Sequence, residues 1–235
     1  MIEQKRKRRV AVFDIDGTLF RSSLLIELVE ALILEKIFPA AIRSRYGKAY
    51  RNWLERRGGY EKYIAGVVRA FEGNIRGVRE KDLVRVAGDV IAFHQNRLYR
   101  YTRDLLKGLK RRRYYLLAIS HSPRYVVNDF AVHLGFDKIY GRLLELDRRE
   151  RFTGRILNEE LINDKAKILL RAVRKENLTL KGSVGVGDTE SDIPFLKLVE
   201  RPICFNPNQP LYRAAKRNHW PVVVERKDVI YSIRN

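Results

Sequence analysis

A short apolar segment that ends in two carboxylates limits what this chain can fold into more than any other part of it. Residues 10–13 (VAVF) form an apolar run that is too brief for a helix and typical of a buried strand. Asp14 and Asp16 follow, and Gly17 lets the chain turn directly after them. Alternate residues of an extended segment point the same way, and ligands of parallel sheets bind at the carboxyl ends of strands. The segment therefore predicts a strand that presents Asp14 and Asp16 to one ligand.

Two interpretations of this segment differ in what the carboxylates do. In the first, Asp-Ile-Asp-Gly is only a polar turn after a strand. In the second, one carboxylate attacks an electrophile while the other moves a proton, and a divalent cation holds the two negative charges close together. Two more apolar runs, 114–119 and 183–186, also end abruptly in polar residues, and this recurrence favours the second interpretation. The polar residues after the three runs are Asp14 and Asp16, Ser120, and Asp188 and Asp192.

The order of strand and helix patterns predicts the fold class. From residue 97 onward strands alternate with helices, which predicts an α/β fold with a parallel sheet and helices on both of its faces. Residues 22 to 94 show no strand pattern and indicate a helical unit between two α/β pieces. The 235 residues suffice for one domain, or one domain with an insertion. We also expect a first helix capped by Ser22 or Ser23, a helix over 97–113, a hairpin over 138–156 with its turn near 148–151, a helix capped by Asn163 or Asp164, and a last strand over 222–224.

The composition of the chain indicates which classes of ligand it attracts and excludes two kinds of cysteine site. Lys and Arg outnumber Asp and Glu by 48 to 28, and the formal charge of +20 predicts attraction to phosphorylated metabolites, nucleic acid or an acidic membrane surface. The basic tip, residues 5–9, is expected to be a solvated tail, with phosphate or nucleic-acid contact as the alternative. No nucleic-acid-binding motif is visible, and no pattern indicates an oligomeric state. A single cysteine, Cys204, excludes a disulfide framework within the chain and a Cys-cluster zinc site.

We expect a cytoplasmic protein without a membrane span. The basic N-terminus leads into a strand and not into the apolar region of a secretory signal. The longest apolar stretch, residues 24–38, is too short and too charged to cross a bilayer.

Four motifs in a fixed order resemble those of a known enzyme family. They are Asp14-Ile15-Asp16-Gly17-Thr18, the strand that ends in Ser120, Lys165 within NDKAKILL, and Gly187-Asp188-Thr189-Glu190-Ser191-Asp192. This set resembles the haloacid dehalogenase (HAD) superfamily of phosphohydrolases, whose signatures include DxDGT and GDxxxD. The long gap after the first motif is similar to the phosphoserine-phosphatase-like subfamily IB, as are the stretches 151–156 and 205–222. The resemblance implies a three-layer Rossmannoid core, residues 1–20 and 95–235, and an inserted all-helical cap of the C1 type, residues 21–94.

The resemblance also implies a mechanism. Asp14 attacks phosphorus and forms an aspartyl-phosphate, and Asp16 donates a proton to the leaving oxygen and then accepts one from water. Mg²⁺ is bound by Asp14, the backbone carbonyl of Asp16, and Asp188. Gly17 and Thr18 belong to the phosphate-binding first loop, which Thr18 braces.

Further residues are implied to bind the phosphoryl group or to support the site. Ser120, the backbone N–H of His121, and Lys165 bind the phosphoryl oxygens. Asp192 supports the metal or orients Lys165.

Each of these residues also has a plainer interpretation. Ser120 can be a helix cap, and Asp192 can be only an N-terminal helix residue. Lys165 can be a surface residue, with Lys167 as its rival in the site. The His121 side chain can act as a base, although Asp16 already fills that role.

The predicted function is a Mg²⁺-dependent phosphomonoesterase that hydrolyses a small phosphorylated metabolite through an aspartyl-phosphate. Two alternatives use the same scaffold: an anion-binding or nucleic-acid-binding protein, and a phosphotransferase. Phosphoserine is not favoured as the substrate, because Ser23 stands where phosphoserine phosphatases place a Glu, and residues 189–191 depart from their GDGAND motif. The arginines of the helical insertion are expected to form a solvated surface, with an anion-binding inner face of the cap as the alternative; they are Arg21, Arg43, Arg45, Arg56 and Arg57.

Overall fold

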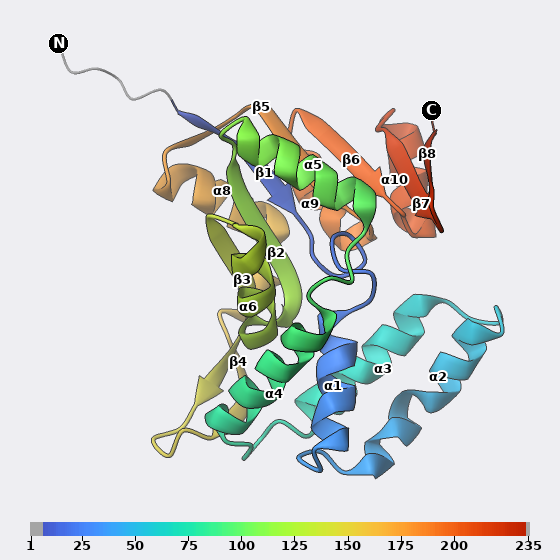
Figure 1. Cartoon of the computed structure of the whole chain (residues 1–235), viewed down its shortest axis with the longest axis vertical. Coiled ribbons are helices and arrows are strands. Elements are labelled where there is room, and N and C mark those ends of the chain that lie inside the picture. Colours follow the sequence, from blue (N-terminus) through green and yellow to red (C-terminus); the bar gives the residue numbers. More distant parts are fainter. Residues whose placement is uncertain (1–6, 234–235) are drawn as a thin grey trace.

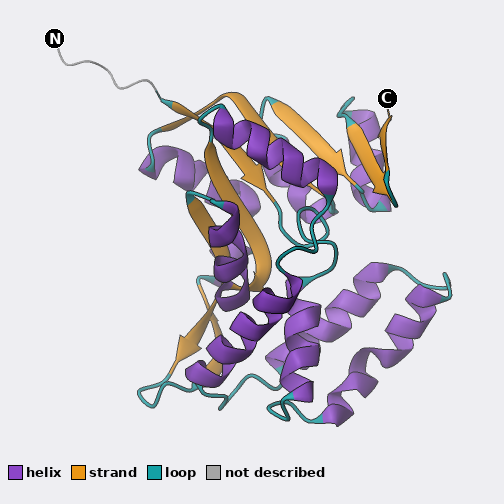
Figure 2. Ribbon diagram, viewed as in Figure 1, coloured by secondary structure: helices purple, strands orange, loops and turns teal. Residues whose placement is uncertain are grey.

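An eight-stranded sheet forms the centre of the computed structural model, which describes residues 7–233 (Figures 1 and 2). The strand order is β4-β3-β2-β1-β5-β6-β7-β8. Neighbouring strands are parallel except for two antiparallel pairs at the edges, β3 with β4 and β7 with β8. The predicted α/β fold with a mostly parallel sheet is therefore confirmed. The strands are β1 (Arg8–Phe13), β2 (Tyr115–Pro123), β3 (Lys138–Leu146), β4 (Phe152–Leu157), β5 (Leu178–Gly187), β6 (Arg201–Phe205), β7 (Val222–Arg226) and β8 (Val229–Ile233).

Helices cover both faces of the sheet, and alternate side chains of β1 pack into a different apolar cluster on each face. Ala11 and Phe13 belong to one buried apolar cluster, which includes residues of α5 and α6. Val10 and Val12 belong to the other, which includes residues of α8, α9 and α10. A strand buried on both faces reads as an unbroken apolar run, as residues 10–13 do. The helices are α5 (Arg100–Arg111), α6 (Arg124–Leu134), α7 (Glu159–Ile162), α8 (Lys165–Lys175), η2 (Glu190–Asp192), α9 (Ile193–Leu196) and α10 (Gln209–Arg217).

The segment between β1 and α5 is helical, and the structure describes no strand within residues 24–94. It lies beside the carboxyl end of the sheet (Figure 1). Its apolar residues join the α5–α6 cluster, so one continuous core runs from the sheet into these helices. The exact division into a core and a cap stays a prediction. The helices are α1 (Leu24–Leu34), η1 (Ala40–Arg43), α2 (Ser44–Leu54), α3 (Tyr60–Glu72) and α4 (Glu80–His94).

The β3–β4 hairpin ties these helices to the sheet a second time. The backbone N–H of Gly77 donates to the carbonyl of Phe152 at 2.8 Å, and the N–H of Phe152 donates to Val78 at 2.9 Å. Arg142 of β3 donates to the carboxylate of Glu72, the last residue of α3, at 2.7 Å. The helical segment is therefore held at two places. The α3–α4 loop is bound to the sheet edge, and the two ends of the segment meet near residues 20 and 97.

Two local predictions are corrected. Arg8 and Arg9 belong to β1 and not to a solvated tail: Arg8 pairs with Asp137 at 3.3 Å, and the Arg9 guanidinium lies 4.5 Å from the ring centre of Tyr114. Pairing with an acid and stacking on a ring offset the charge of these strand residues. The first part of the basic tip, residues 5 and 6, lies outside the described residues. Strand β8 was not predicted, because its mostly exposed residues show no alternation to reveal it.

Other local predictions agree with the structure. The hairpin turn falls between β3 and β4, and Asp164 caps α8 by accepting from the N–H of Lys167 at 3.0 Å. Within residues 7–233, no helix is both long enough and apolar enough to cross a membrane.

Replacing Phe152 by Ala is expected to lower the free energy of unfolding by about 3–5 kcal/mol. Its side chain is 1 % exposed and packs edge-to-face on Tyr125 at 5.6 Å, where the hairpin meets the helices. Phe93→Ala is the matched control, because Phe93 is 83 % exposed, and it should change the free energy by less than about 0.5 kcal/mol. Urea unfolding measures both. Equal effects of the two substitutions would contradict the packing described for Phe152.

Candidate active site

Three neighbouring strands bring the predicted site residues to one edge of the sheet. β1 lies between β2 and β5, so Asp14 after β1, Ser120 near the end of β2 and Asp188 after β5 meet at their carboxyl ends. Gly17 makes this approach possible. Its φ is +79°, and a Cβ at this position would collide with the carboxylate of Asp188.

Lys165 lies at the centre of the site. It is the first residue of α8 and 2 % exposed, and its Nζ lies 2.5 Å from Asp14 Oδ1 and 2.6 Å from Asp192 Oδ1. Burial alone would lower the pKa of this ammonium, but the charges of Asp14 and Asp192 outweigh it and hold the pKa above its ordinary value. The rival Lys167 points to the outside of α8, where it is 69 % exposed and pairs with Asp164. The structure thus brings Lys165, and not Lys167, to Asp14.

Three carboxylates lie close together here, and two of them pair with Lys165. Oxygens of Asp14, Asp188 and Asp192 all lie within 4.8 Å of one another. Burial, opposed by Lys165 and reinforced by Asp192 and Asp16, raises the pKa of Asp14 to about 7. Burial and the charges of Asp14 and Asp192 also raise the pKa of Asp188 well above its ordinary value. Because one ammonium cannot balance three carboxylates, the cluster fits a divalent cation, and its all-oxygen donors suit Mg²⁺.

Asp192 has most of its acceptor capacity filled by the protein. Besides Lys165 on Oδ1, its Oδ2 accepts from the backbone N–H groups of Asp188 at 2.9 Å and Thr189 at 3.1 Å. It also completes a capping box with Thr189 at the start of η2. Asp192 is therefore both a helix-capping residue and an orienter of Lys165, which leaves Asp14 and Asp188 as the freer carboxylates.

The Asp16 side chain lies outside this cluster of three carboxylates and accepts three hydrogen bonds. Its Oδ1 accepts from the backbone N–H of Leu24 at 2.5 Å, and its Oδ2 from the hydroxyls of Ser120 at 2.6 Å and Ser122 at 2.9 Å. Ser23 occupies the cap position of α1 without a side-chain cap hydrogen bond, because the Asp16 carboxylate meets the helix instead. The Asp16 backbone carbonyl remains as the group predicted to face a metal.

Thr18 and His121 support the site in different ways. The Thr18 hydroxyl donates to Asp188 Oδ1 at 3.1 Å, and its carbonyl accepts from the Thr102 hydroxyl at 2.8 Å, so Thr18 does brace the first loop. The His121 ring points elsewhere: its Nε2 lies 3.1 Å from the carbonyl of Ile162. Burial, and then the charges of Lys165 and Arg142, lower the pKa of His121 to about 4. A neutral ring that donates to a carbonyl does not act as a base from that nitrogen.

Sequence analysis missed three polar residues around the site. Ser122 lies two positions after Ser120, the same spacing as Asp14 and Asp16, and that spacing was the signal for it. Tyr60, at the start of α3, has its pKa raised by burial and then by the charges of Asp16 and Asp188. Asn208 donates to Glu190, and its amide lies 3.4 Å from Glu61 of α3. No sequence pattern indicated these last two contacts. The arginines expected on a solvated surface are all exposed, namely Arg21, Arg43, Arg45, Arg56 and Arg57.

Comparison with known proteins agrees with this site. The profile of the haloacid dehalogenase-like hydrolases matches residues 11–197, and the chain belongs to that family. It is 26 % identical over 208 residues to a phosphoserine phosphatase of Archaeoglobus fulgidus, a match that covers 88 % of this chain and 55 % of the relative. It is 23 % identical to a phosphoserine phosphatase of Methanocaldococcus jannaschii, covering 86 % and 87 % of the two chains. The chain thus spans only about half the length of the first relative and most of the second.

A solved structure shows the same fold. It is described as a phospho-aspartyl intermediate analogue of phosphoserine phosphatase and aligns with a TM-score of 0.61 at 21 % identity, covering 95 % of this chain and 96 % of that one. The predicted membership of the family is confirmed, and the phosphoserine phosphatases among the similar proteins are consistent with its predicted phosphoserine-phosphatase-like branch. The predicted enzyme class, a HAD-type phosphatase, agrees with these relatives.

The raised pKa of Asp14 predicts a pH-dependent response to Mg²⁺. Its value rises from 3.8 to about 7 on folding, so the metal-free protein gains stability from a protonated Asp14 below about pH 4 and loses this gain as the pH rises to 7. Mg²⁺ binds the ionised form, so its stabilising effect should be larger at pH 8 than at pH 5.5. Thermal unfolding with Mg²⁺ or EDTA at both pH values measures this.

Asp188→Asn should abolish most of the Mg²⁺ effect, whereas Asp147→Asn, an exposed turn residue, should leave it intact. An equal Mg²⁺ effect at both pH values would contradict the raised pKa of Asp14, and a full Mg²⁺ effect in Asp188→Asn would show that this carboxylate does not hold the ion.

Proposed function

We propose that the chain is a Mg²⁺-dependent phosphomonoesterase that acts on a small phosphorylated metabolite through an aspartyl-phosphate. One observation carries the proposal: Asp14 is buried, lies 2.5 Å from the Lys165 ammonium, and has a carboxylate oxygen within 4.8 Å of one of Asp188. A carboxylate in this setting has a neighbouring cation to offset the charge of an incoming phosphate dianion. The family match and the phosphatase relatives support the same chemistry.

The proposed reaction has two steps. A carboxylate oxygen of Asp14 forms a bond to phosphorus while the bond from phosphorus to the leaving oxygen breaks, and Asp16 gives its proton to that oxygen. Water then attacks phosphorus, Asp16 takes the proton from the water, and the bond from Asp14 to phosphorus breaks to release phosphate. The Ser120 hydroxyl, the His121 backbone N–H and the Lys165 ammonium bind the phosphoryl oxygens.

A bound Mg²⁺ would be held by Asp14, the Asp16 carbonyl and Asp188, and it would supply positive charge next to the phosphoryl oxygens. Phosphoryl transfer to an acceptor other than water would use the same residues. A panel of alcohol acceptors added to the assay separates the two reactions.

We further propose that residues 21–94 act as the cap and residues 1–20 and 95–235 as the core. Support comes from the contacts of α1 and α3 with the catalytic edge, namely Leu24 with Asp16 and Glu61 with Asn208. Asp14 is only 5 % exposed beneath them, which suits a small substrate and exclusion of bulk water. A reducing compartment such as the cytoplasm suits the single cysteine, Cys204, which is buried.

The relatives' names make phosphoserine one candidate substrate. The site argues against it as the preferred one. Ser23, at the cap of α1, offers no carboxylate for an amino group, and Glu190 of the fourth motif binds Asn208. Phosphoserine therefore belongs in a substrate panel beside phosphate esters without an amino group.

Asp14→Asn is expected to abolish phosphate release from every ester in such a panel, because an amide lacks the charge and nucleophilicity of the carboxylate. The wild-type protein should release phosphate with Mg²⁺ and lose this activity with EDTA. A colorimetric phosphate assay on both proteins checks this, with Asp147→Asn as the surface control. Turnover by Asp14→Asn at the wild-type rate would refute the proposed mechanism.

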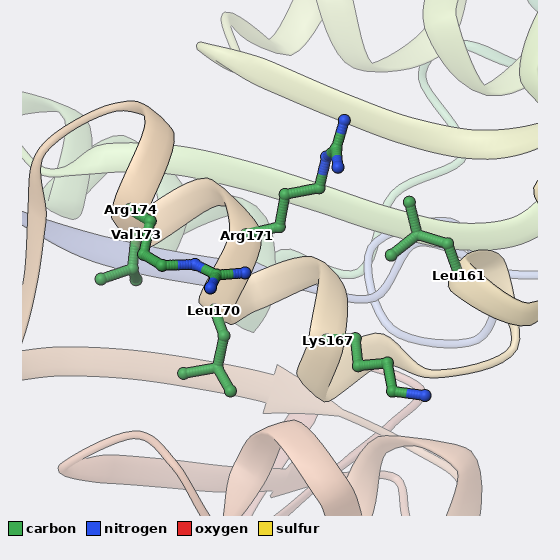
Figure 3. Close-up of a pocket in the computed structure, with 6 residues that line it drawn as sticks. All are labelled: Leu161, Lys167, Leu170, Arg171, Val173 and Arg174. Carbon is green, nitrogen blue, oxygen red and sulfur yellow. The ribbon is translucent and has the colours of Figure 1, made fainter.

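A second candidate function, nucleic-acid binding, is favoured by a basic surface on α8. A hollow of about 440 Å³ is lined there by Lys167, Arg171 and Arg174 and by three apolar side chains (Figure 3). A second hollow of about 260 Å³ shares Leu161 and Arg171 with it. No Asp or Glu lines either hollow among the described residues, although the overall charge of +20 includes 28 acidic residues. A surface whose cations outnumber its acids attracts the phosphates of a polynucleotide, although Lys167 also pairs with Asp164 and Lys138 with Glu176. The second hollow is also lined by Arg124, Lys138 and Lys175.

This candidate predicts that the protein binds a fluorescein-labelled 20-nucleotide single-stranded RNA in 50 mM NaCl and that binding weakens steeply with salt. Replacing Lys167, Arg171 and Arg174 together by Glu should weaken binding by about tenfold or more and flatten the salt dependence. Fluorescence anisotropy measures both.

The matched control replaces Arg51, Arg56 and Lys62 by Glu, which changes the net charge equally on α2, α3 and the loop between them. Equal losses in the two triple variants would mean that overall charge alone attracts RNA. No binding by the wild-type protein would remove this candidate function.

A further inference from the structure

We propose that Ser122 is a positioning residue, which holds the carboxyl group of Asp16 when the Ser120 hydroxyl turns to the phosphoryl group. The inference rests on the proposed phosphatase function and deepens it. It explains why two buried hydroxyls converge on one oxygen of Asp16.

Both serines donate to Asp16 Oδ2, Ser120 at 2.6 Å and Ser122 at 2.9 Å, and both are almost fully buried. The pairing of β2 with β3 shifts register between Ile119 and Pro123, so residues 120–122 leave the regular ladder and turn toward the site. Asp16 Oδ1 is held separately by the N–H of Leu24.

Ser120 cannot serve Asp16 and the substrate at the same time. A serine hydroxyl has one proton to donate. The backbone N–H of Ser122 already donates to Ser120 Oγ at 2.9 Å, which fills one lone pair and aims the hydroxyl proton elsewhere. In the structure that proton goes to Asp16, and in the proposed reaction it goes to a phosphoryl oxygen.

Once Ser120 has turned, Ser122 is the side chain that still donates to Asp16 Oδ2. Without it, Asp16 would be fixed at Oδ1 only and free to rotate about its Cβ–Cγ bond. The loss would fall on proton transfer from Asp16 to the leaving oxygen and, for every ester alike, on proton transfer from water in the second step. The attack of Asp14 on phosphorus would be unaffected. An alkoxide leaving group needs that proton, whereas 4-nitrophenolate leaves without it.

The experiment compares Ser122→Ala with the wild-type protein on two esters, 4-nitrophenyl phosphate and an alkyl phosphate. We expect kcat/KM for the alkyl ester to fall about tenfold or more and kcat/KM for the aryl ester to fall less than about threefold, because kcat/KM reports the steps up to release of the alcohol and not the later attack of water. Ser183→Ala is the matched control: Ser183 is equally buried, but it accepts from the N–H of Glu200 away from the site, and both rates should persist. Equal losses on the two esters, or no loss, would overturn the proposal.

A second measurement does not need turnover. A crystal structure of the protein with beryllium trifluoride on Asp14, a mimic of the aspartyl-phosphate, should place Ser120 Oγ against a fluorine and Ser122 Oγ still within hydrogen-bond distance of Asp16. Ser122 turned away from Asp16, or no adduct on Asp14 at all, would overturn the inference. A wild-type protein that hydrolyses nothing but forms the adduct with Ser122 in place would refute the proposed function alone.

Discussion

The site depends on one interaction, the burial of the Lys165 ammonium between Asp14 and Asp192. A buried charge without partners is very costly, so removing any member of this set leaves the others uncompensated. The neighbouring features follow from the need to bring these groups together. Gly17 and Gly187 leave room for the carboxylates, because a Cβ at Gly187 would lie 2.5 Å from the Asp192 side chain. The Thr18 hydroxyl donates to one oxygen of Asp188, and two backbone N–H groups donate to the second oxygen of Asp192. The excess of negative charge that survives is what a divalent cation would offset.

The sequence predicted the catalytic edge well because strand ends are a local property. Each of the three strands shows an apolar run and the Asp or Ser after it within about ten residues of sequence. The order of the parallel strands then brings these ends together. Ser122 carried the same signal at the same spacing, and attention to alternation alone would have found it. Tyr60 and Asn208 are different. Their place at the site depends on how α3 packs against the loops after β5 and β6, and helical periodicity shows which face is apolar but not which neighbour it meets. The edge strand β8 was missed because its residues are not selected for burial.

The helical segment and the sheet are not energetically separate bodies. Phe20, Phe130 and residues of α1 and α4 share one apolar cluster with the face of the sheet that α5 and α6 cover. Asp16 joins the two parts by a polar contact as well, since its carboxylate accepts from the first N–H of α1. The start of that helix and the orientation of the residue proposed to move protons are therefore set together. This coupling gives a physical reason why the helices follow directly after the first motif.

The second tie, between the α3–α4 loop and the β3–β4 hairpin, restricts how a substrate reaches Asp14. Because the helical segment is fixed to the sheet at two separate places, it cannot rotate as one rigid body about a single hinge. Helices α1 and α4 are held at the chain crossings, at α6 and at the hairpin, whereas α2 and the first turn of α3 extend away from these supports (Figure 1). On the side of α2 and α3, Asn208 before α10 lies 3.4 Å from Glu61 and connects α3 to the loops of the sheet. We therefore expect substrate and product to pass between α3 and the loop before α10. A local movement of α2 and α3 would then set the rate of product release. Hydrogen exchange confined to α2 and the start of α3 would reveal that motion, and uniform exchange across α1–α4 would exclude it.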